Sequence, residues 1–171
     1  TKKKRHKDDF TPGGENTKRP DRASIVYTGL IKRFFKNSKT PIVLGGIEAS
    51  LRRIVHYDYW SNQLRRSLIF DAKADILSYG MGEKSIVEIA DALNSGIDVK
   101  HITFIQGTVY KTKDISGIYK GEILPTYEEM KADNLRYADS FQIQYENTDP
   151  FSGKTLIEEY PNGIYVVQNP P

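Results

Sequence analysis

The side chains most capable of chemistry gather in one stretch of the sequence, residues 48–60. A titratable imidazole among carboxylates and guanidinium groups can serve as a general acid or base, and aromatic rings beside it can stack on a ligand. Ser50 and His56 lie six residues apart, which is poor geometry for a nucleophile and its base on one helix. The candidate ligand-lining or interface-lining residues of this stretch are Glu48, Ser50, Arg52, Arg53, His56, Tyr57, Asp58 and Trp60.

The same stretch has two interpretations. On a helix, Glu48 pairs with Arg52 at i,i+4, and Arg52 shares a face with His56. We expect the stretch to line a pocket or an interdomain surface, with Arg52 and His56 making polar contacts there. The alternative is fold architecture, in which the aromatic rings pack inward and the charges pair with one another.

Two glycine turns are the second candidate feature. Gly45 and Gly46 follow a short apolar strand at 42–44, and Gly80-Met81-Gly82 follows another at 74–79. Ligands of parallel sheets bind beyond the carboxyl ends of strands, and glycine lets a ligand approach the backbone closely. Tight strand-to-helix turns need glycine for the same conformational reason, so both interpretations stay open.

The residue that follows the second turn restricts the chemical class of ligand that could bind there. Glu83 enters the first turn of the next expected helix, where its carboxylate occupies the positive end of the helix dipole. A pyrophosphate is therefore disfavoured there, and a neutral or cationic group is favoured. The candidate residues at the two turns are Gly45, Gly46, Gly80, Gly82 and Glu83.

Alternating helical and strand periodicity predicts the elements that position these residues. We expect an α/β fold with a parallel sheet and helices on both faces, Rossmann-like, followed by a C-terminal helix and a β-hairpin. The expected helices are 20–36, most of 47–70 with an interruption at 56–61, 83–95 and 125–145. The expected strands are 42–44, 74–79 and 101–110, with a hairpin at 155–168. The segment 101–110 is either one strand or a bent strand pair broken at Gly107. Residues 112–124 and the first ten residues are polar, and we predict that both are mobile.

Two of the expected helices have an apolar face. On 20–36 the apolar residues that recur at spacings of three and four include Leu30 and Phe34, and on 83–95 they include Ile86 and Ile89.

Composition limits the chemistry available to the chain. Its 171 residues are 38% hydrophobic and 27% charged, which suits one globular core, and the longest charge-free runs are too short to span a bilayer. The absence of cysteine excludes disulfides, thiolate zinc sites and cysteine-held iron–sulfur clusters within these residues. The three histidines, His6, His56 and His101, share no metal-ligand spacing. We therefore assign no catalytic or metal-ligating residue. Separately, we expect a cytoplasmic location.

Charge is distributed unevenly along the chain. Residues 1–39 carry a net charge of +8, whereas residues 122–160 carry −6. The basic run at 2–7 is compatible with nucleic-acid binding, but no aromatic residue interleaves with it and two aspartates follow directly. A solvated arm is the alternative interpretation. The two oppositely charged segments could also dock on each other or on partners of opposite sign.

Several sequence strings together resemble one protein family. They are Thr11-Pro-Gly-Gly14, Arg19-Pro-Asp-Arg-Ala23, PIVLGGIEASLRRIVHYDYW at 41–60, Arg65-Arg66-Ser67, ADILSYGMGE at 74–83 and the closing Asn169-Pro170-Pro171. This set resembles the YgiQ family of radical SAM proteins. The resemblance is dense over residues 11–93 and loose over 112–168.

The resemblance implies an organisation and a role. It implies a basic arm at 1–19, a partial domain similar to cobalamin-binding domains at 20–111, and a variable extension at 112–171. A radical SAM barrel would follow in the same chain, with a CxxxCxxC loop holding a [4Fe–4S] cluster that reductively cleaves S-adenosylmethionine to a radical. The D-x-H-x-x-G motif of cobalamin proteins is absent, so cobalamin is not expected, and no cofactor is expected on these residues.

Three functional hypotheses follow. In the first, the chain is the substrate-side accessory domain of a radical SAM enzyme of unknown substrate, with the barrel of the same chain as its partner. In the second, it is a non-catalytic interdomain scaffold. In the third, it is a nucleic-acid-binding module that uses the basic arm. None of the three involves a membrane.

Overall fold

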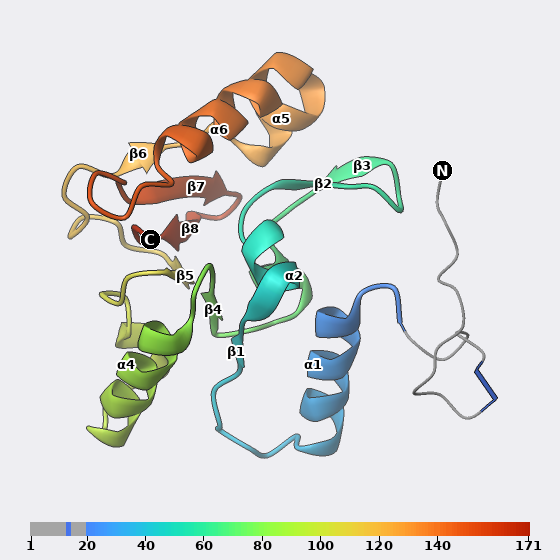
Figure 1. Cartoon of the computed structure of the whole chain (residues 1–171), viewed down its shortest axis with the longest axis vertical. Coiled ribbons are helices and arrows are strands. Elements are labelled where there is room, and N and C mark those ends of the chain that lie inside the picture. The colour runs from blue at the N-terminus through green and yellow to red at the C-terminus, as the bar shows by residue number, and fades with distance from the viewer. Residues whose placement is uncertain (1–12, 15–19) are drawn as a thin grey trace.

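The computed structural model describes residues 13–14 and 20–171 (Figure 1). Most of the expected basic arm, the basic run at 2–7 and half of the Thr11–Gly14 string lie outside the described residues. The helices are α1 (Ala23–Phe34), α2 (Gly46–Leu51), α3 (Leu68–Asp71), α4 (Glu83–Asn94), the 3-10 turn η1 (Val99–His101), α5 (Tyr127–Ala132) and α6 (Asn134–Glu146). The strands are β1 (Val43–Leu44), β2 (His56–Asp58), β3 (Gln63–Arg65), β4 (Ile76–Ser78), β5 (Thr108–Thr112), β6 (Glu122–Ile123), β7 (Leu156–Tyr160) and β8 (Ile164–Gln168).

The main sheet has six strands in the order β1-β4-β5-β8-β7-β6. Only the pairs β1–β4 and β6–β7 are parallel, and the other three pairs are antiparallel. The expected parallel pairing is present between β1 and β4 but not between β4 and β5, so the fold is a mixed α/β arrangement.

The direction of β5 explains the difference. After α4 and η1, the chain returns past Ile102 and Ile105, which are buried against α4 and Ile76 and belong to no strand. Gly107 then adopts a φ of +68° and its carbonyl accepts the Tyr79 N–H at 2.9 Å. The chain reverses there and enters β5 antiparallel to β4, so the expected strand at 101–110 begins only at Thr108.

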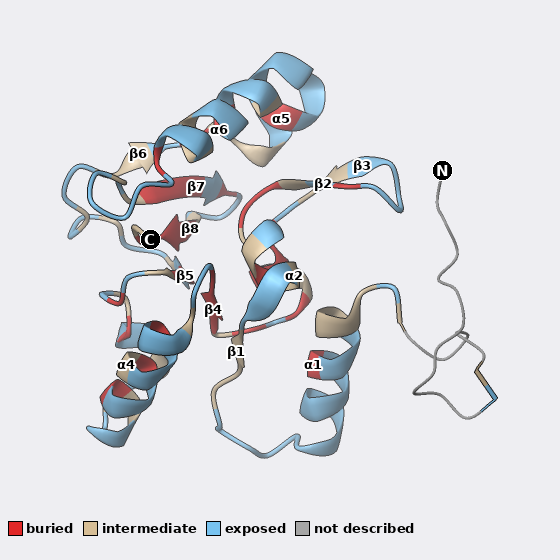
Figure 2. Cartoon of the chain, in the orientation of Figure 1, coloured by how far each residue is buried: buried red, intermediate tan, exposed pale blue. Residues whose placement is uncertain are grey.

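Two apolar clusters lie on opposite faces of the sheet, as expected for helices on both faces. The neighbouring residues Ile76 and Leu77 of β4 point to different clusters, because successive strand side chains alternate. Ile76 packs with α4, whereas Leu77 belongs to the cluster that contains residues of α2, α3 and α5. Figure 2 shows β4 coloured as buried, between these two layers. On α4 the buried residues are Ser85, Ile89 and Ala92. Ile89 of the expected apolar face is therefore buried, whereas Ile86 is 48% exposed.

Residues 47–70 differ most from expectation. The helix ends at Leu51, and the chain continues into a β2–β3 hairpin in place of a helix. Ile54 and Val55 are buried, and the Val55 N–H donates to the Glu158 carboxylate at 2.8 Å, which takes this backbone out of helical bonding. Arg52 and His56 therefore do not share a helix face.

The C-terminal third matches the sequence in part. The β7–β8 hairpin turns at Pro161-Asn162-Gly163, with positive φ at Asn162 and Gly163, as predicted. The single expected helix at 125–145 is two helices, because Asp133 has an extended backbone and its side chain caps α6 through the Leu135 N–H. The expected loop at 112–124 contributes β6, which extends the sheet beside β7. No helix in the described part of the chain combines the length and apolarity needed to cross a bilayer.

Candidate functional site

The two glycine turns meet, because β1 and β4 are parallel neighbours. Gly46 and Gly80 both have positive φ, +81° and +69°. The Ser50 Oγ donates to the Gly46 carbonyl at 2.9 Å and accepts the Gly80 N–H at 3.1 Å. One hydroxyl on α2 therefore holds the two turns together, and we call this group the glycine junction (Gly46, Ser50 and Gly80).

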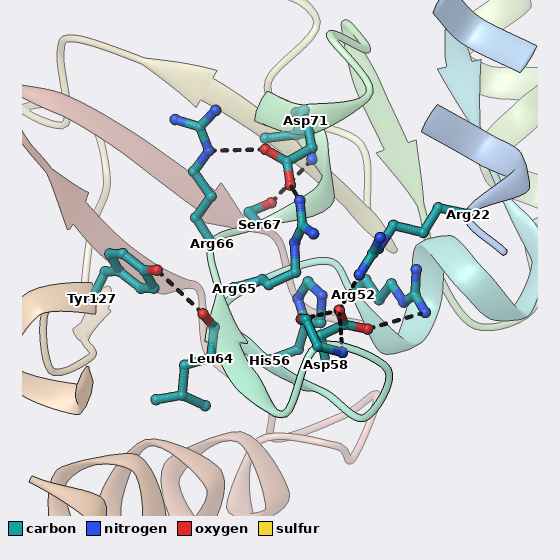
Figure 3. A network of polar contacts seen from close by, with 12 residues as sticks. Arg22, Arg52, His56, Asp58, Leu64, Arg65, Arg66, Ser67, Asp71 and Tyr127 are labelled. Atoms are coloured by element: carbon teal, nitrogen blue, oxygen red, sulfur yellow. Dashed lines mark hydrogen bonds and ion pairs between the residues drawn. The ribbon is translucent and has the colours of Figure 1, made fainter. Parts of the chain in front are cut away.

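A network of charged groups lies beside the junction (Figure 3). Its centre is Asp58, whose side chain is fully buried. Arg22, at the start of α1, and the Ser61 hydroxyl donate to one carboxylate oxygen, and Arg52 lies 4.0 Å from the other. Burial alone would raise the pKa of Asp58, but the hydrogen bonds from Ser61 and Arg22 hold it well below its usual range.

Glu48 extends this network to the start of α1. Its carboxylate accepts the Ser24 N–H at 3.1 Å and the Ser24 hydroxyl at 2.8 Å, and it pairs with Arg52 at 2.9 Å. The expected i,i+4 pair between Glu48 and Arg52 is therefore present. Through Arg22 and Ser24, the network attaches α1 to α2 and to the β2–β3 hairpin.

A hollow of about 590 Å³ lies next to the network and shares Glu48 and Arg52 with it. Glu48 and Arg52 contribute polar lining, and Ile47, Leu51 and Trp60 contribute apolar lining. Ile47 and Leu51 are 79% and 70% exposed although they belong to a helix whose Ala49 is part of the core. The hollow is thus a polar pocket with an ion pair on its wall and apolar side chains at its rim.

His56 lies next to the network but does not line the hollow. Its Nδ1 is 3.1 Å from the Ile54 carbonyl. Burial lowers the pKa of His56, and the cations Arg52 and Arg65 lower it further against the opposing effects of Ile54 and Asp58. These effects favour the uncharged form of the imidazole, and its general acid–base role stays a prediction.

Arg53 points into the interior instead. It donates to the Gln168 side chain at 2.7 Å and to the Ser50 carbonyl at 2.6 Å, and it lies 4.9 Å from the Tyr79 ring centroid. Burial lowers its pKa, while the Tyr79 and Glu158 side chains act in the opposite direction. Arg53 therefore joins α2 to the C-terminal hairpin.

Two more predicted residues lie apart from the hollow. The Tyr57 N–H donates to the Tyr137 hydroxyl at 3.2 Å, so this part of β2 faces α6. Glu83 is the first residue of α4 and does not line the hollow. Gly82 caps that helix, and a Cβ on it would lie 2.8 Å from the Ser78 hydroxyl, so a larger residue would need a local shift.

Sequence reasoning missed Arg22 and Ser24 as site residues. Arg22 belongs to the string at 19–23, which indicated family resemblance alone, and no motif marks Ser24. Their role depends on α1 lying across α2, which periodicity does not reveal. An acidic partner for Arg22 was available in Asp58, but 36 residues separate the two.

A [4Fe–4S] cluster does not match the donor set of this chain, since all 171 residues lack cysteine. Among the described residues, no three histidine, aspartate or glutamate side chains gather as metal ligands do. No step of iron–sulfur chemistry is therefore assigned to residues of this chain.

Comparison with known proteins places the chain in a family. All of it, residues 1–171, matches the family described as Radical SAM N-terminal, so the chain belongs to the N-terminal domains of radical SAM proteins. More particularly, it is similar to UPF0313 proteins. It is 52% identical over 172 residues to one from Clostridium perfringens and 50% identical over 171 residues to one from Fusobacterium nucleatum.

These matches cover the whole chain but only part of each relative. The chain spans 26% of the Clostridium perfringens protein and 29% of the Fusobacterium nucleatum protein. A UPF0313 protein of Clostridium botulinum, 49% identical, is covered to the same 26%. No solved structure matches the chain.

Proposed function

We propose that this chain is the accessory domain of a radical SAM enzyme and docks on the catalytic barrel of the same protein, close to the substrate. The finer assignment to the YgiQ family, the cytoplasmic location and the role of the barrel as partner are parts of this proposal. The observation that carries it is a group of exposed apolar side chains beside the glycine junction.

This group, the apolar belt, comes from four segments. Its members are Tyr27, Leu30, Phe34, Ile47, Leu51, Trp60 and Met81. The α1 members recur every three or four residues on one helix face, and Tyr27 meets Ile47, Leu51 and Trp60 around the hollow. Met81 is 87% exposed and follows Gly80, which is bonded to Ser50 on α2.

Part of the apolar face of α1 is exposed. On α1 the buried residue is Thr28, while Phe34 is 75% exposed. Large exposed apolar patches on a folded domain mark interaction surfaces, because leaving them in water costs about 25 cal/mol per Å² of apolar area. The chain spans about a quarter of the length of its relatives. The remaining polypeptide of such a protein could cover these apolar side chains.

The family assignment supports separate roles for the barrel and for this chain. In radical SAM enzymes the barrel holds the [4Fe–4S] cluster and S-adenosylmethionine, and this chain lacks the cysteines to do so. What this chain supplies is the apolar belt and the hollow with its Glu48–Arg52 pair. Docking the belt would bring that hollow to the barrel, where it would help to exclude water and bind the polar part of a substrate.

Variants of the full-length protein test the proposal. Leu51→Glu places a charge in the belt, and Val87→Glu is a matched control on α4, where Val87 is 57% exposed. We expect Leu51→Glu to lower the formation of 5′-deoxyadenosine by the reconstituted enzyme at least tenfold, with Val87→Glu unchanged. Equal activity of the two variants, with both folded, would contradict docking through the belt.

A further inference from the structure

A second hollow lies at the opposite end of the sheet from the glycine junction. Ser78, at the carboxyl end of β4, pairs with Thr108, so the last residues of β5 lie at the amino end of β4. There a hollow of about 790 Å³ opens between α3, η1 and the end of β5. We call it the lysine hollow; its lining includes Phe70, Lys100, Lys111, Lys113, Asp114 and Ile164.

The cations of the lysine hollow are poorly neutralised. Lys100 has a partner in Asp98 at 3.3 Å. Across the described residues, no carboxylate lies within ion-pair distance of Lys111 or Lys113. Asp114 is on the lining, but its carboxylate accepts the Ser116 N–H at 2.8 Å.

The surroundings of Lys111 disfavour the charged form of its side chain. Its ammonium lies 5.7 Å from the centroid of the Phe70 ring, and the Arg66 guanidinium lies 5.1 Å from the same centroid. Burial lowers the pKa of Lys111, and the nearby cations Lys32 and Arg66 lower it further, against the attraction of Asp75. An anion in the lysine hollow would relieve this repulsion.

Charge and shape together indicate the class of ligand. A phosphate carries a charge of about −1.5 to −2 at pH 7 and three acceptor oxygens, which suits two or three converging ammonium groups. Phe70 and Ile164 provide an apolar wall for an organic group. The volume lies within the range of about 300–1,000 Å³ that is usual for small-molecule sites.

We propose that the lysine hollow binds a phosphorylated small molecule, with Lys111 and Lys113 on the phosphate and the organic part against Phe70 and Ile164. A nucleic acid is disfavoured, because it needs cations spread along successive phosphates. Here three lysines line one hollow, together with Asp114, and Asp98 pairs with one of them. The site is separate from the apolar belt and does not depend on the proposed function.

Calorimetric titration of the full chain tests this inference, with inorganic phosphate and adenosine monophosphate as probes. The test variant is the double substitution Lys111→Gln and Lys113→Gln, and the control is Lys84→Gln on the exposed face of α4. We expect adenosine monophosphate to bind more tightly than phosphate, and its affinity to fall at least tenfold in the double variant. The control should keep its affinity within twofold.

Three results would overturn the inference. They are no binding of either probe at millimolar concentration, an equal loss of affinity in both variants, or tighter binding of a single-stranded RNA that survives the double substitution. Circular dichroism verifies that the variants fold. The single variant Lys113→Gln, beyond the end of β5, provides the same comparison if the double variant does not fold.

Discussion

The hydroxyl of Ser50 accepts the backbone N–H of Gly80 at 3.1 Å, across 30 residues of sequence. The bond joins the turn after β4 to the helix after β1, at the carboxyl ends of the two strands, where the sequence predicts that a ligand can approach. The Ser50 side chain therefore occupies the space between the turns. The open surface lies next to it, at the hollow lined by Glu48, Arg52 and Trp60.

Alanine at Gly80 should destabilise the fold. The φ of +69° is left-handed, where a residue with a Cβ is about 1–2 kcal/mol less favourable. Gly29, inside α1, is the control, because open space surrounds the position that its Cβ would take. Gly29→Ala should stabilise by about 0.5–1 kcal/mol, since glycine is unfavourable within a helix. Urea unfolding of the two variants measures these opposite shifts, and shifts of the same sign would contradict the assigned conformations.

Replacing Asp58 with asparagine should lower the free energy of unfolding by about 3 kcal/mol, because the Arg22 and Arg52 guanidinium groups lose their buried counter-charge. The pKa of Asp58 is lowered in the fold, so its stabilisation is present above the unfolded pKa near 3.8 and is lost as pH falls below it. Asp21→Asn, an exposed neighbour, is the control. In denaturant unfolding at neutral pH, the midpoint concentration should fall for Asp58→Asn and stay unchanged for Asp21→Asn. Equal midpoints for the two variants would refute the buried network.

Glutamine at Glu158 should change how stability depends on pH. Burial raises the pKa of Glu158 to about 7, from an ordinary 4.5. The folded state therefore holds a proton that the unfolded chain releases, so this contribution is full below pH 4.5 and is lost as pH rises through 7. The complete loss amounts to roughly 3 kcal/mol, at about 1.4 kcal/mol per pKa unit.

The measurement for Glu158 is the difference in unfolding free energy between wild type and Glu158→Gln at several pH values. The advantage of wild type should shrink by roughly 2–3 kcal/mol between about pH 5 and pH 8. Glu159→Gln, on the exposed side of the same strand, should show no such trend. A constant difference across this range would mean that Glu158 ionises as it does in the unfolded chain.

Local sequence signals predicted the elements whose determinants are local. The extent of α1, the start of α4 at Glu83 and the hairpin at Pro161-Asn162-Gly163 depend on nearby periodicity and turn residues. The pair Glu48–Arg52 was predictable for the same reason, since it spans a single helical turn.

The errors have long-range causes. The helix expected through Arg52 and His56 gives way because Val55 bonds to Glu158, 103 residues later. The direction of β5 depends on Ile102 and Ile105 packing under α4. Arg22 joins the network around Asp58 only because the start of α1 contacts α2 and the β2–β3 hairpin, a tertiary contact that spacing along the chain does not encode.

Side-chain oxidation by hydroxyl radicals tests docking of the apolar belt most directly. Met81 is 87% exposed in this chain and reacts readily when accessible, whereas Phe151 is 97% exposed and lies outside the belt. Each residue is compared with itself, in the isolated chain and in the full-length protein. We predict that Met81 is oxidised at least tenfold more slowly in the full-length protein while Phe151 is unchanged. Equal oxidation of Met81 in the two proteins would contradict the docking of the belt.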